Sequence, residues 1–209
     1  MNDGTPRARG FTLVELLVVI TILAMLLGIG AVGYNKFRGR GDYAATVGIL
    51  ESVKGYLEQY RNAQGDYPKS SLAGYGIKAK NHLFEGNEAM VVGLYHKDYD
   101  GARVDEQHLR NLDGDKADKN VTINAIPDLN EVVDAWDNPL VYIRYDDYEK
   151  EHEYEFVTDA TGEIESVVVK AATSERTGSF FARESYQLLS VGEDGVYGTE
   201  DDITSYSAN

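Results

Sequence analysis

An apolar stretch near the N-terminus, residues 11–32, constrains the fold of this chain more than any other feature. Glu15 is its only ionisable side chain. Roughly 20 apolar residues in a helix are enough to cross a bilayer, and a charged side chain inside such a segment costs about 2.5–3.5 kcal/mol on insertion scales. We therefore predict a long N-terminal helix whose first half, residues 11–33, spans a membrane. We expect Glu15 to have a partner there, most simply a cation.

Two ordinary interpretations of this stretch explain less of the sequence. A secretory signal peptide is cleaved after its apolar region, beside small residues in an A-x-A-like pattern. Residues 31–34, Ala-Val-Gly-Tyr, fit that pattern poorly, and Glu15 would stand inside the apolar region. A plain signal anchor would cross the membrane but would leave both Glu15 and the Gly-Phe junction in front of it unexplained.

Residues 9–15, Arg-Gly-Phe-Thr-Leu-Val-Glu, resemble the class III signal of type IV pilins and of the pseudopilins of type II secretion systems. In that family a prepilin peptidase cuts after the glycine and methylates the new N-terminal amine. The resemblance implies that residues 1–10 are a cytoplasmic leader, that the chain is cleaved between Gly10 and Phe11, and that Phe11 is N-methylated. It also implies that Glu15 pairs with the N-terminal amine of a neighbouring subunit in a filament.

The second half of the predicted helix, residues 34–64, is amphipathic. Apolar residues recur there at intervals of three or four, which places them on one face. They are Tyr43, Val47, Leu50, Val53, Leu57 and Tyr60. We expect this face to lie against a sheet and the helix to end by Gly65, with Pro68 just beyond it. Residues 64–68 also resemble the Gly-x-Tyr-Pro step that leads into the globular domain of major pseudopilins.

Three glycines, Gly28, Gly30 and Gly33, lie in the apolar half of the helix. Each costs roughly 1 kcal/mol of helix stability relative to alanine. They could let the helix loosen when subunits pack in a filament, or they could allow close approach between membrane helices.

Residues 65–209 are predicted to form the globular domain, with a variable insert at about 69–130. Within the insert, Asn87 is a candidate N-cap for a short helix that ends at Leu94. Residues 98–118 carry seven acidic side chains, Asp98, Asp100, Asp105, Glu106, Asp113, Asp115 and Asp118. They begin like a calcium loop but lack the glycine and glutamate of an EF-hand. We interpret them as a solvated acidic loop and assign the insert no function.

The chain turns to β-structure after Asp134. Strands are predicted at 140–143, 154–157, 164–169 and 186–190, the middle two joined as a hairpin by the turn residues 159–162. Residues 134–142 resemble the Asp-Pro-Trp-Gly-Asn-Pro-x-x-Tyr signature of major pseudopilins, with Ala135 in place of proline and Asp137 in place of glycine. The predicted fold class is α+β and pilin-like, a long helix packed on a small antiparallel sheet domain.

The C-terminal stretch 190–203 carries three glycines and a cluster of carboxylates. Such a density of charge repels itself, and calcium, which accepts six to eight oxygen ligands in loose geometry, would relieve it. The stretch resembles the calcium loop of major pseudopilins, which implies Asp194, Asp201 and Asp202 as side-chain ligands. Backbone oxygens near Leu189 and Val196 would complete the shell. The ion would be structural; the alternative is an acidic β-turn.

Composition excludes several other functions. A net charge of −15 argues against a nucleic-acid partner, which would select a basic surface. The chain has no cysteine, so thiol catalysis and cysteine-based zinc sites are excluded. Its four histidines lie far apart in the sequence, with no metalloprotease spacing. We expect no enzymatic activity; a membrane-anchored enzyme that carries the same export signal is the remaining alternative of that class.

The resemblance implies a major-pseudopilin-like subunit of a type II secretion system. Such a protein lies in the bacterial inner membrane as a single-pass protein, with its C-terminal domain in the periplasm, and then assembles into a periplasmic pseudopilus that drives protein export across the outer membrane. Its partners would be copies of itself, the prepilin peptidase, other pseudopilins, the inner-membrane assembly platform, and membrane lipid before assembly. The alternative is a structural subunit of a surface type IV pilus used for adhesion, motility or DNA uptake.

Overall fold

The structure of the chain, a computed structural model, describes residues 13–123, 128–158 and 161–206; its account of side chains leaves out residues 26–39. The chain divides into two compact units, Met1–Gly41 and Asp42–Asn209. The described part of the first unit is helical, and the second unit contains the sheets and the rest of the helices.

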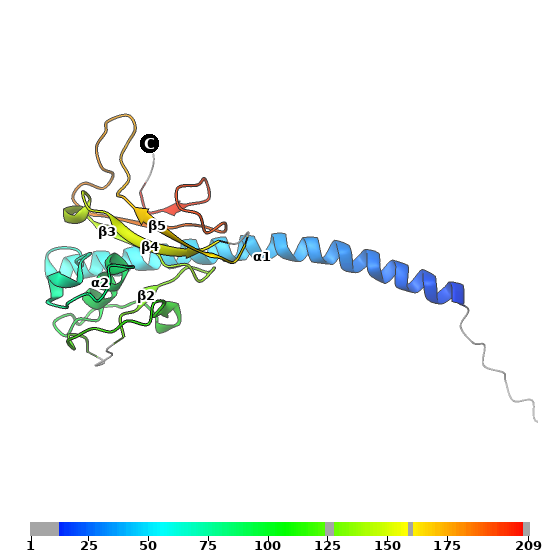
Figure 1. Cartoon of the computed structure of the whole chain (residues 1–209), viewed down its shortest axis with the longest axis horizontal. Coiled ribbons are helices and arrows are strands. Elements are labelled where there is room, and N and C mark those ends of the chain that lie inside the picture. Colours follow the sequence, from blue (N-terminus) through cyan, green and yellow to red (C-terminus); the bar gives the residue numbers. More distant parts are fainter. Residues whose placement is uncertain (1–12, 124–127, 159–160, 207–209) are drawn as a thin grey trace, which may run out of the picture. The chain divides into compact units, whose positions relative to one another are not determined.

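A single helix, α1 (Leu13–Gln64), runs through 52 residues, drawn from blue to cyan in Figure 1. It ends where predicted. Gly65 follows with a φ of +86°, and its N–H donates to the carbonyl of Arg61 at 2.8 Å. Glycine takes this left-handed conformation without the strain that a side chain would bring. Because α1 is one helix from Leu13 to Gln64, the predicted continuity of the apolar and amphipathic halves is confirmed.

The membrane-spanning role of the first half is a separate matter. Among the residues described, none of the helices combines the length and the hydropathy that crossing a membrane requires. The predicted span over residues 11–33 is thus not supported by the structure and stays a prediction.

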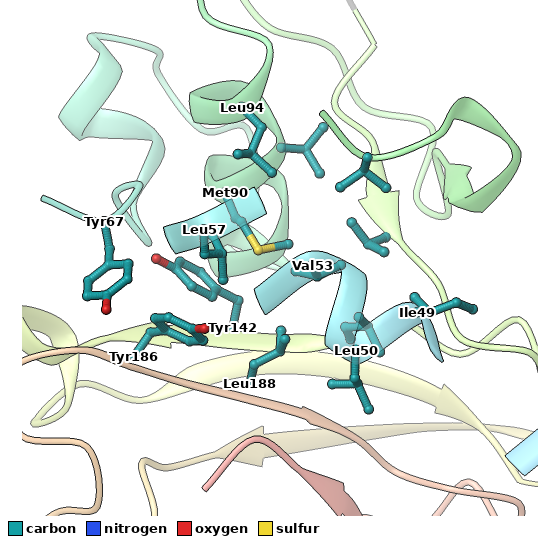
Figure 2. Packing of buried hydrophobic residues seen from close by; sticks show 14 of the residues in the cluster. Ile49, Leu50, Val53, Leu57, Tyr67, Met90, Leu94, Tyr142, Tyr186 and Leu188 are labelled. Carbon is teal, nitrogen blue, oxygen red and sulfur yellow. The ribbon is translucent and has the colours of Figure 1, made fainter. Parts of the chain in front are cut away.

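The second half of α1 contributes one face to the main apolar core. The buried positions of this face are Thr46, Ile49, Leu50, Val53 and Leu57. In Figure 2 the face lies between Met90 and Leu94 of α2 (Glu85–Leu94) on one side and Leu188 on the other. The prediction is wrong at Tyr43, whose side chain is 53 % exposed, because the buried stripe is rotated toward Thr46 and Ile49.

Helix α2 shows how the insert is tied to the sheets. Asn87 is not the N-cap, which is Phe84; it lies inside the helix and is fully buried. Its side-chain amide donates to the carbonyls of Val132 at 2.9 Å and Leu140 at 2.7 Å, and its oxygen accepts the N–H of Val132 at 2.8 Å. The sequence-based role of Asn87 is therefore corrected from a helix cap to a tie between the helix and two β-segments.

The insert at 69–130 is an ordered part of the domain wherever the structure describes it. Besides α2 it contains two 3-10 helices, η1 (Leu72–Tyr75) and η2 (Glu106–His108). It builds an apolar cluster from the buried residues Leu72, Ile77, Ala89, Val92 and Leu129. One side of α2 faces this cluster while another faces α1.

Seven short strands form three antiparallel sheets among the residues described. The strands are β1 (Leu109–Arg110), β2 (Glu131–Val132), β3 (Val141–Arg144), β4 (His152–Val157), β5 (Ile164–Val169), β6 (Tyr186–Ser190) and β7 (Ile203–Thr204). The sheets are β1–β2, β3–β6–β7 and β4–β5. The α+β class is confirmed, as is the pairing of the strands predicted at 154–157 and 164–169 in a hairpin; residues 159–160 of its predicted turn lie outside the described residues. The prediction of a single small sheet is wrong, since the described residues form three sheets. β3 pairs with β6, and the two strands of the hairpin, β4 and β5, pair with each other in a separate sheet.

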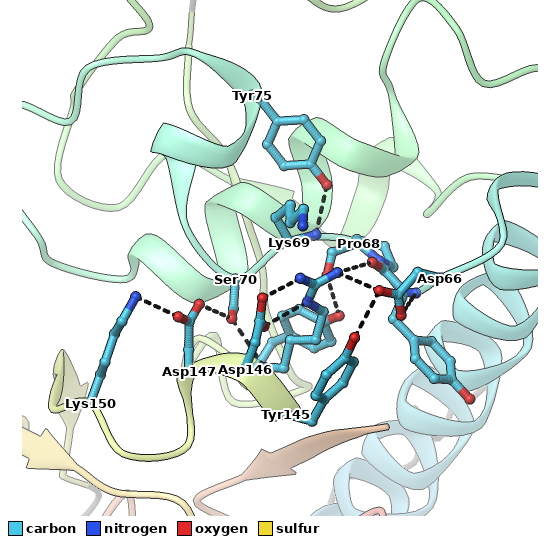
Figure 3. A network of polar contacts seen from close by, with 12 residues as sticks. Asp66, Pro68, Lys69, Ser70, Tyr75, Tyr145, Asp146, Asp147 and Lys150 are labelled. Carbon is cyan, nitrogen blue, oxygen red and sulfur yellow. Dashed lines mark hydrogen bonds and ion pairs between the residues drawn. The ribbon is translucent and has the colours of Figure 1, made fainter. Parts of the chain in front are cut away.

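A polar network fixes the segment that leaves α1 (Figure 3). Arg144, at the end of β3, has a side chain only 3 % exposed and pairs with Asp66 at 3.0 Å and with Asp146. The hydroxyl of Tyr142 donates to the carbonyl of Pro68 at 2.7 Å. The residues of the Gly-x-Tyr-Pro step are thus bound to β3, an edge strand of the three-stranded sheet, and the exit of the chain from the helix is fixed.

Candidate functional site

The N-terminal motif is only partly within the described residues. Gly10 and Phe11 lie outside them. Glu15 lies in the first turn of α1 and is exposed. The large apolar side chains around it are exposed as well, from 82 % for Leu13 to 45 % for Val19. A helix that is apolar on all sides occurs where lipid or other helices surround it, so this surface is one that other molecules would cover.

The C-terminal acidic loop is a connection between two paired strands. β6 leads into it, and β7 returns to pair with β6, with Ser190 opposite Ile203. Gly192, Gly195 and Gly198 all have positive φ, between +68° and +89°. A Cβ atom on Gly195 would lie 2.0 Å from the carbonyl oxygen of Val157. The loop therefore needs a glycine there both for its conformation and for close contact with the end of β4.

The predicted ligands Asp194, Asp201 and Asp202 are brought into this one loop, where they hold its backbone. Asp201 accepts the N–H of Asp194 at 3.0 Å and the hydroxyl of Thr199. Asp202 accepts the N–H of Gly198 at 3.0 Å. Burial alone would raise the pKa of Asp201, but these hydrogen bonds outweigh it and lower the pKa.

Asp202 is the least satisfied of the three. Its Oδ1 is buried and has no hydrogen-bond partner. Burial, supported by the charges of Asp201 and Asp194, raises the pKa of Asp202 to about 6. An orphaned carboxylate oxygen of this kind fits a cation ligand. In the described part of the chain, however, the three aspartates do not offer three oxygens within 4.8 Å of one another.

The two predicted backbone ligands have different surroundings. The carbonyl of Val196 lies in the loop and accepts the hydroxyl of Thr199 at 3.3 Å. Leu189 is buried in β6, in register with Thr204.

The turn at residues 134–139 supports the base of the loop. Ser190 donates its hydroxyl to Asp134 at 2.6 Å, and Asp134 accepts the N–H groups of Trp136 and Asn138. Burial raises the pKa of Asp134 to about 6, against the effect of these bonds. Asp137 has a φ of +63°. The departure from glycine at this position is therefore accommodated as expected, since aspartate tolerates the left-handed region better than most residues.

One group of functional candidates was missed in the sequence. Glu88, Asp113 and Glu131 offer carboxylate oxygens within 4.8 Å of one another, and Asp115 is buried beside them. Burial first, and then the neighbouring carboxylates, raise the pKa of Glu88; burial raises the pKa of Glu131 and of Asp115 as well. The prediction of a solvated acidic loop is therefore wrong at Asp115, although Asp98 is exposed.

A signal for this group was present in the sequence. Glu88 and Glu131 each stand directly beside apolar residues, before Ala-Met-Val-Val and Val-Val respectively. A carboxylate next to such a run is a candidate for burial. Nothing in the spacing of the four residues shows that they meet.

Comparison with known proteins places the similarity in part of the chain. A family model described as "Prokaryotic N-terminal methylation motif" matches residues 5–31. The type IV major pilin protein PilE1 of Neisseria gonorrhoeae is 27 % identical over 73 residues, which are 35 % of this chain and 34 % of the pilin. The fimbrial protein EcpC of Eikenella corrodens is 31 % identical over 71 residues, 34 % of this chain and 46 % of that protein.

The chain thus spans between a third and a half of the length of these curated relatives. No solved structure matches the chain significantly. The matched range includes Gly10, Phe11 and Glu15. With the motif and the pilin relatives taken together, the chain is a type IV pilin-like protein.

Proposed function

We propose that the chain is a major-pseudopilin-like subunit of a type II secretion system, which assembles into a periplasmic pseudopilus and drives protein export across the outer membrane. The prepilin peptidase would cut between Gly10 and Phe11 and methylate Phe11. Residues 11–33 would lie in the inner membrane before assembly and in the filament core afterwards. The all-round exposure of the apolar side chains from Leu13 to Met25 supports this, because each such surface needs a cover of lipid or helices.

The observation that favours a pseudopilin is the bond between Ser190 and Asp134 at 2.6 Å. It joins two stretches that both resemble major pseudopilins, the turn at 134–142 and the acidic loop at 190–203. If either stretch resembled a major pseudopilin only by chance, a hydrogen bond between the turn and the acidic loop would not be expected.

A structural calcium ion in the acidic loop is part of the proposal. Asp194, Asp201 and Asp202 would hold it, with the carbonyls of Leu189 and Val196, and it would lock the loop to β6. The buried, unpartnered Oδ1 of Asp202 supports this assignment.

The second candidate is a structural subunit of a surface type IV pilus. The curated relatives, a type IV major pilin and a fimbrial protein, favour it. Both candidates share processing and self-assembly; they differ in where the filament ends.

Deletion and complementation in the native host distinguish the two. We expect loss of the chain to abolish secretion of exported proteins into the medium while surface pili remain. A strain that keeps secretion and loses pili would favour the pilus subunit instead.

Three variants test the N-terminal motif in the same strain. Gly10→Val should leave the leader attached, as seen by a mass shift, while Gly4→Val within the leader serves as the matched control. Glu15→Ala should be processed and inserted into the membrane but should fail to form filament crosslinks. Normal crosslinking of Glu15→Ala would contradict the pairing of Glu15 with the amine of a neighbour.

A further inference from the structure

Four carboxylates meet beside the first turn of α2. Glu88 belongs to that helix, Glu131 begins β2, and Asp113 and Asp115 lie in the loop that follows β1. Glu88, Glu131 and Asp115 are 1, 0 and 6 % exposed. Three separate segments of the chain therefore direct acidic side chains into one small buried volume.

The spacing of the oxygens matches that around a single ion. Oxygens of Glu88, Asp113 and Glu131 lie within 4.8 Å of one another. Two oxygens on opposite sides of a calcium ion, each bonded at about 2.4 Å, are themselves about 4.8 Å apart. The spacing of the three carboxylates is therefore compatible with one shared ion.

Several of these oxygens have nothing to bond to. Oε1 of Glu88, Oε1 of Glu131 and both side-chain oxygens of Asp115 are buried without a hydrogen-bond partner. A buried carboxylate without a donor is costly, and structures rarely retain one without a reason. This observation is independent of the clustering itself, and either a bound cation or protons shared between the carboxylates would satisfy it.

The other oxygens hold the side chains in place. The N–H of Leu112 donates to Oε2 of Glu131 at 2.9 Å. Asp113 accepts the N–H of Asp115 at 3.1 Å and the side-chain amide of Asn81 at 2.8 Å. All of these donors are neutral, so they orient the carboxylates without balancing their charge.

Among the residues that the structure describes, no cationic side chain lies within ion-pair distance of this cluster. Burial raises the pKa of Asp115, and Lys80 is near enough only for its charge to lower that pKa somewhat against the effect of burial. The neighbouring Lys116 pairs with Asp128 instead, at 3.3 Å.

We propose that Glu88, Asp113, Asp115 and Glu131 form a calcium site of their own, distinct in its residues from the C-terminal loop. The ion binds the insert to α2 and β2 and neutralises charge that the fold otherwise encloses. The proposal rests on this cluster alone and does not depend on the pilus or pseudopilus assignment.

The donor set selects the ion. All candidate ligands are oxygens, whereas zinc favours histidine and cysteine. Magnesium demands near-ideal octahedral geometry and keeps several waters, which a buried group of carboxylates on three segments does not favour. Calcium tolerates irregular geometry and high ligand charge.

The test uses the full-length chain in detergent micelles, stripped of metal with a chelator. Calcium is titrated calorimetrically, and terbium luminescence excited through tyrosine gives a second readout. The variants are Glu131→Gln and Asp113→Asn in the cluster, Asp202→Ala in the C-terminal loop, and Glu165→Gln on the exposed face of β5 as the matched control.

We expect Glu131→Gln to remove one equivalent of bound calcium, both alone and combined with Asp202→Ala, and Glu165→Gln to remove none. Affinity at the cluster should fall at least as much as the roughly 10- to 100-fold that loss of an outer-shell partner costs. Asp113→Asn, at a half-buried position, keeps the test valid if Glu131→Gln does not fold.

Wild-type stoichiometry in both Glu131→Gln and Asp113→Asn would overturn the proposal and would mean that the carboxylates share protons instead. Because Asp202→Ala is measured separately, failure of the C-terminal site leaves this result unaffected.

Discussion

Replacing Asn87 by aspartate separates two roles for this residue. As a helix N-cap, asparagine and aspartate are equivalent, so the substitution would change little. In the structure Asn87 is buried and its amide group donates to the carbonyls of Val132 and Leu140. Aspartate keeps the acceptor for the Val132 N–H but has no donors.

The expected cost follows from the contacts. Two hydrogen bonds are lost. The Val132 carbonyl still accepts the N–H of Leu140 at 2.9 Å, so loss of its bond from Asn87 costs about 0.5–1.5 kcal/mol, whereas the Leu140 carbonyl loses its donor at about 1–3 kcal/mol. Together they lower the free energy of unfolding by roughly 2–4 kcal/mol, and burial of a new carboxylate adds to this. For a domain of this size each kcal/mol corresponds to about 2–4 °C in Tm, so Asn87→Asp should melt roughly 4–16 °C lower.

The assay is thermal unfolding of the full-length chain in micelles, followed by near-UV circular dichroism. This signal reports tertiary packing in the domain rather than the helicity of the apolar half of α1. Asn120→Asp, at an exposed position, is the matched control. A melting temperature of Asn87→Asp equal to that of the control would refute the tie between α2 and the β-segments.

Three further predictions use the same assay. Leu57→Ala, at a position with no exposure, should cost about 2–5 kcal/mol, whereas Tyr43→Ala should stay within about 0.5 kcal/mol; equal losses would mean that the buried face of α1 is misplaced. Gly195→Ala should destabilise the chain more than Gly198→Ala, because both have positive φ but only Gly195 has a backbone oxygen in the way of a Cβ; the reverse order would count against the packing of the loop on β4. Burial lowers the pKa of His152, so the unfolded chain takes up a proton near pH 6.5 that the folded chain takes up only at lower pH. The free energy of unfolding, relative to that of His152→Gln, should therefore fall as pH drops below about 6.5. Parallel pH profiles of the two proteins would contradict this.

The elements with strong periodicity or turn chemistry were predictable. The end of α1 before Gly65 followed from a glycine and a nearby proline, and the strands at 164–169 and 186–190 coincide with β5 and β6. The positive φ of Asp137 followed from the resemblance to a glycine-containing turn. These features are local, because the residues that determine them are adjacent in the chain.

The rest depends on contacts between distant segments. Asn87 looks like a cap until Val132, 45 residues later, is brought to its side chain. Glu88 and Asp115 are ordinary acidic residues until a helix and a loop place them together. Likewise, the number of sheets follows from the choice of β6 as the partner of β3, and strand propensity does not encode a choice of partner.

The network around Arg144 has a mechanical consequence. A force along α1 that the buried face of the helix does not take up reaches, within a few residues of Gln64, the ion pair of Asp66 with Arg144 and the hydrogen bond from Tyr142 to Pro68. These contacts lie in β3, which is hydrogen-bonded along its length to β6. Drawing out the segment that follows α1 therefore requires breaking contacts with a paired strand, and not only extending a free loop.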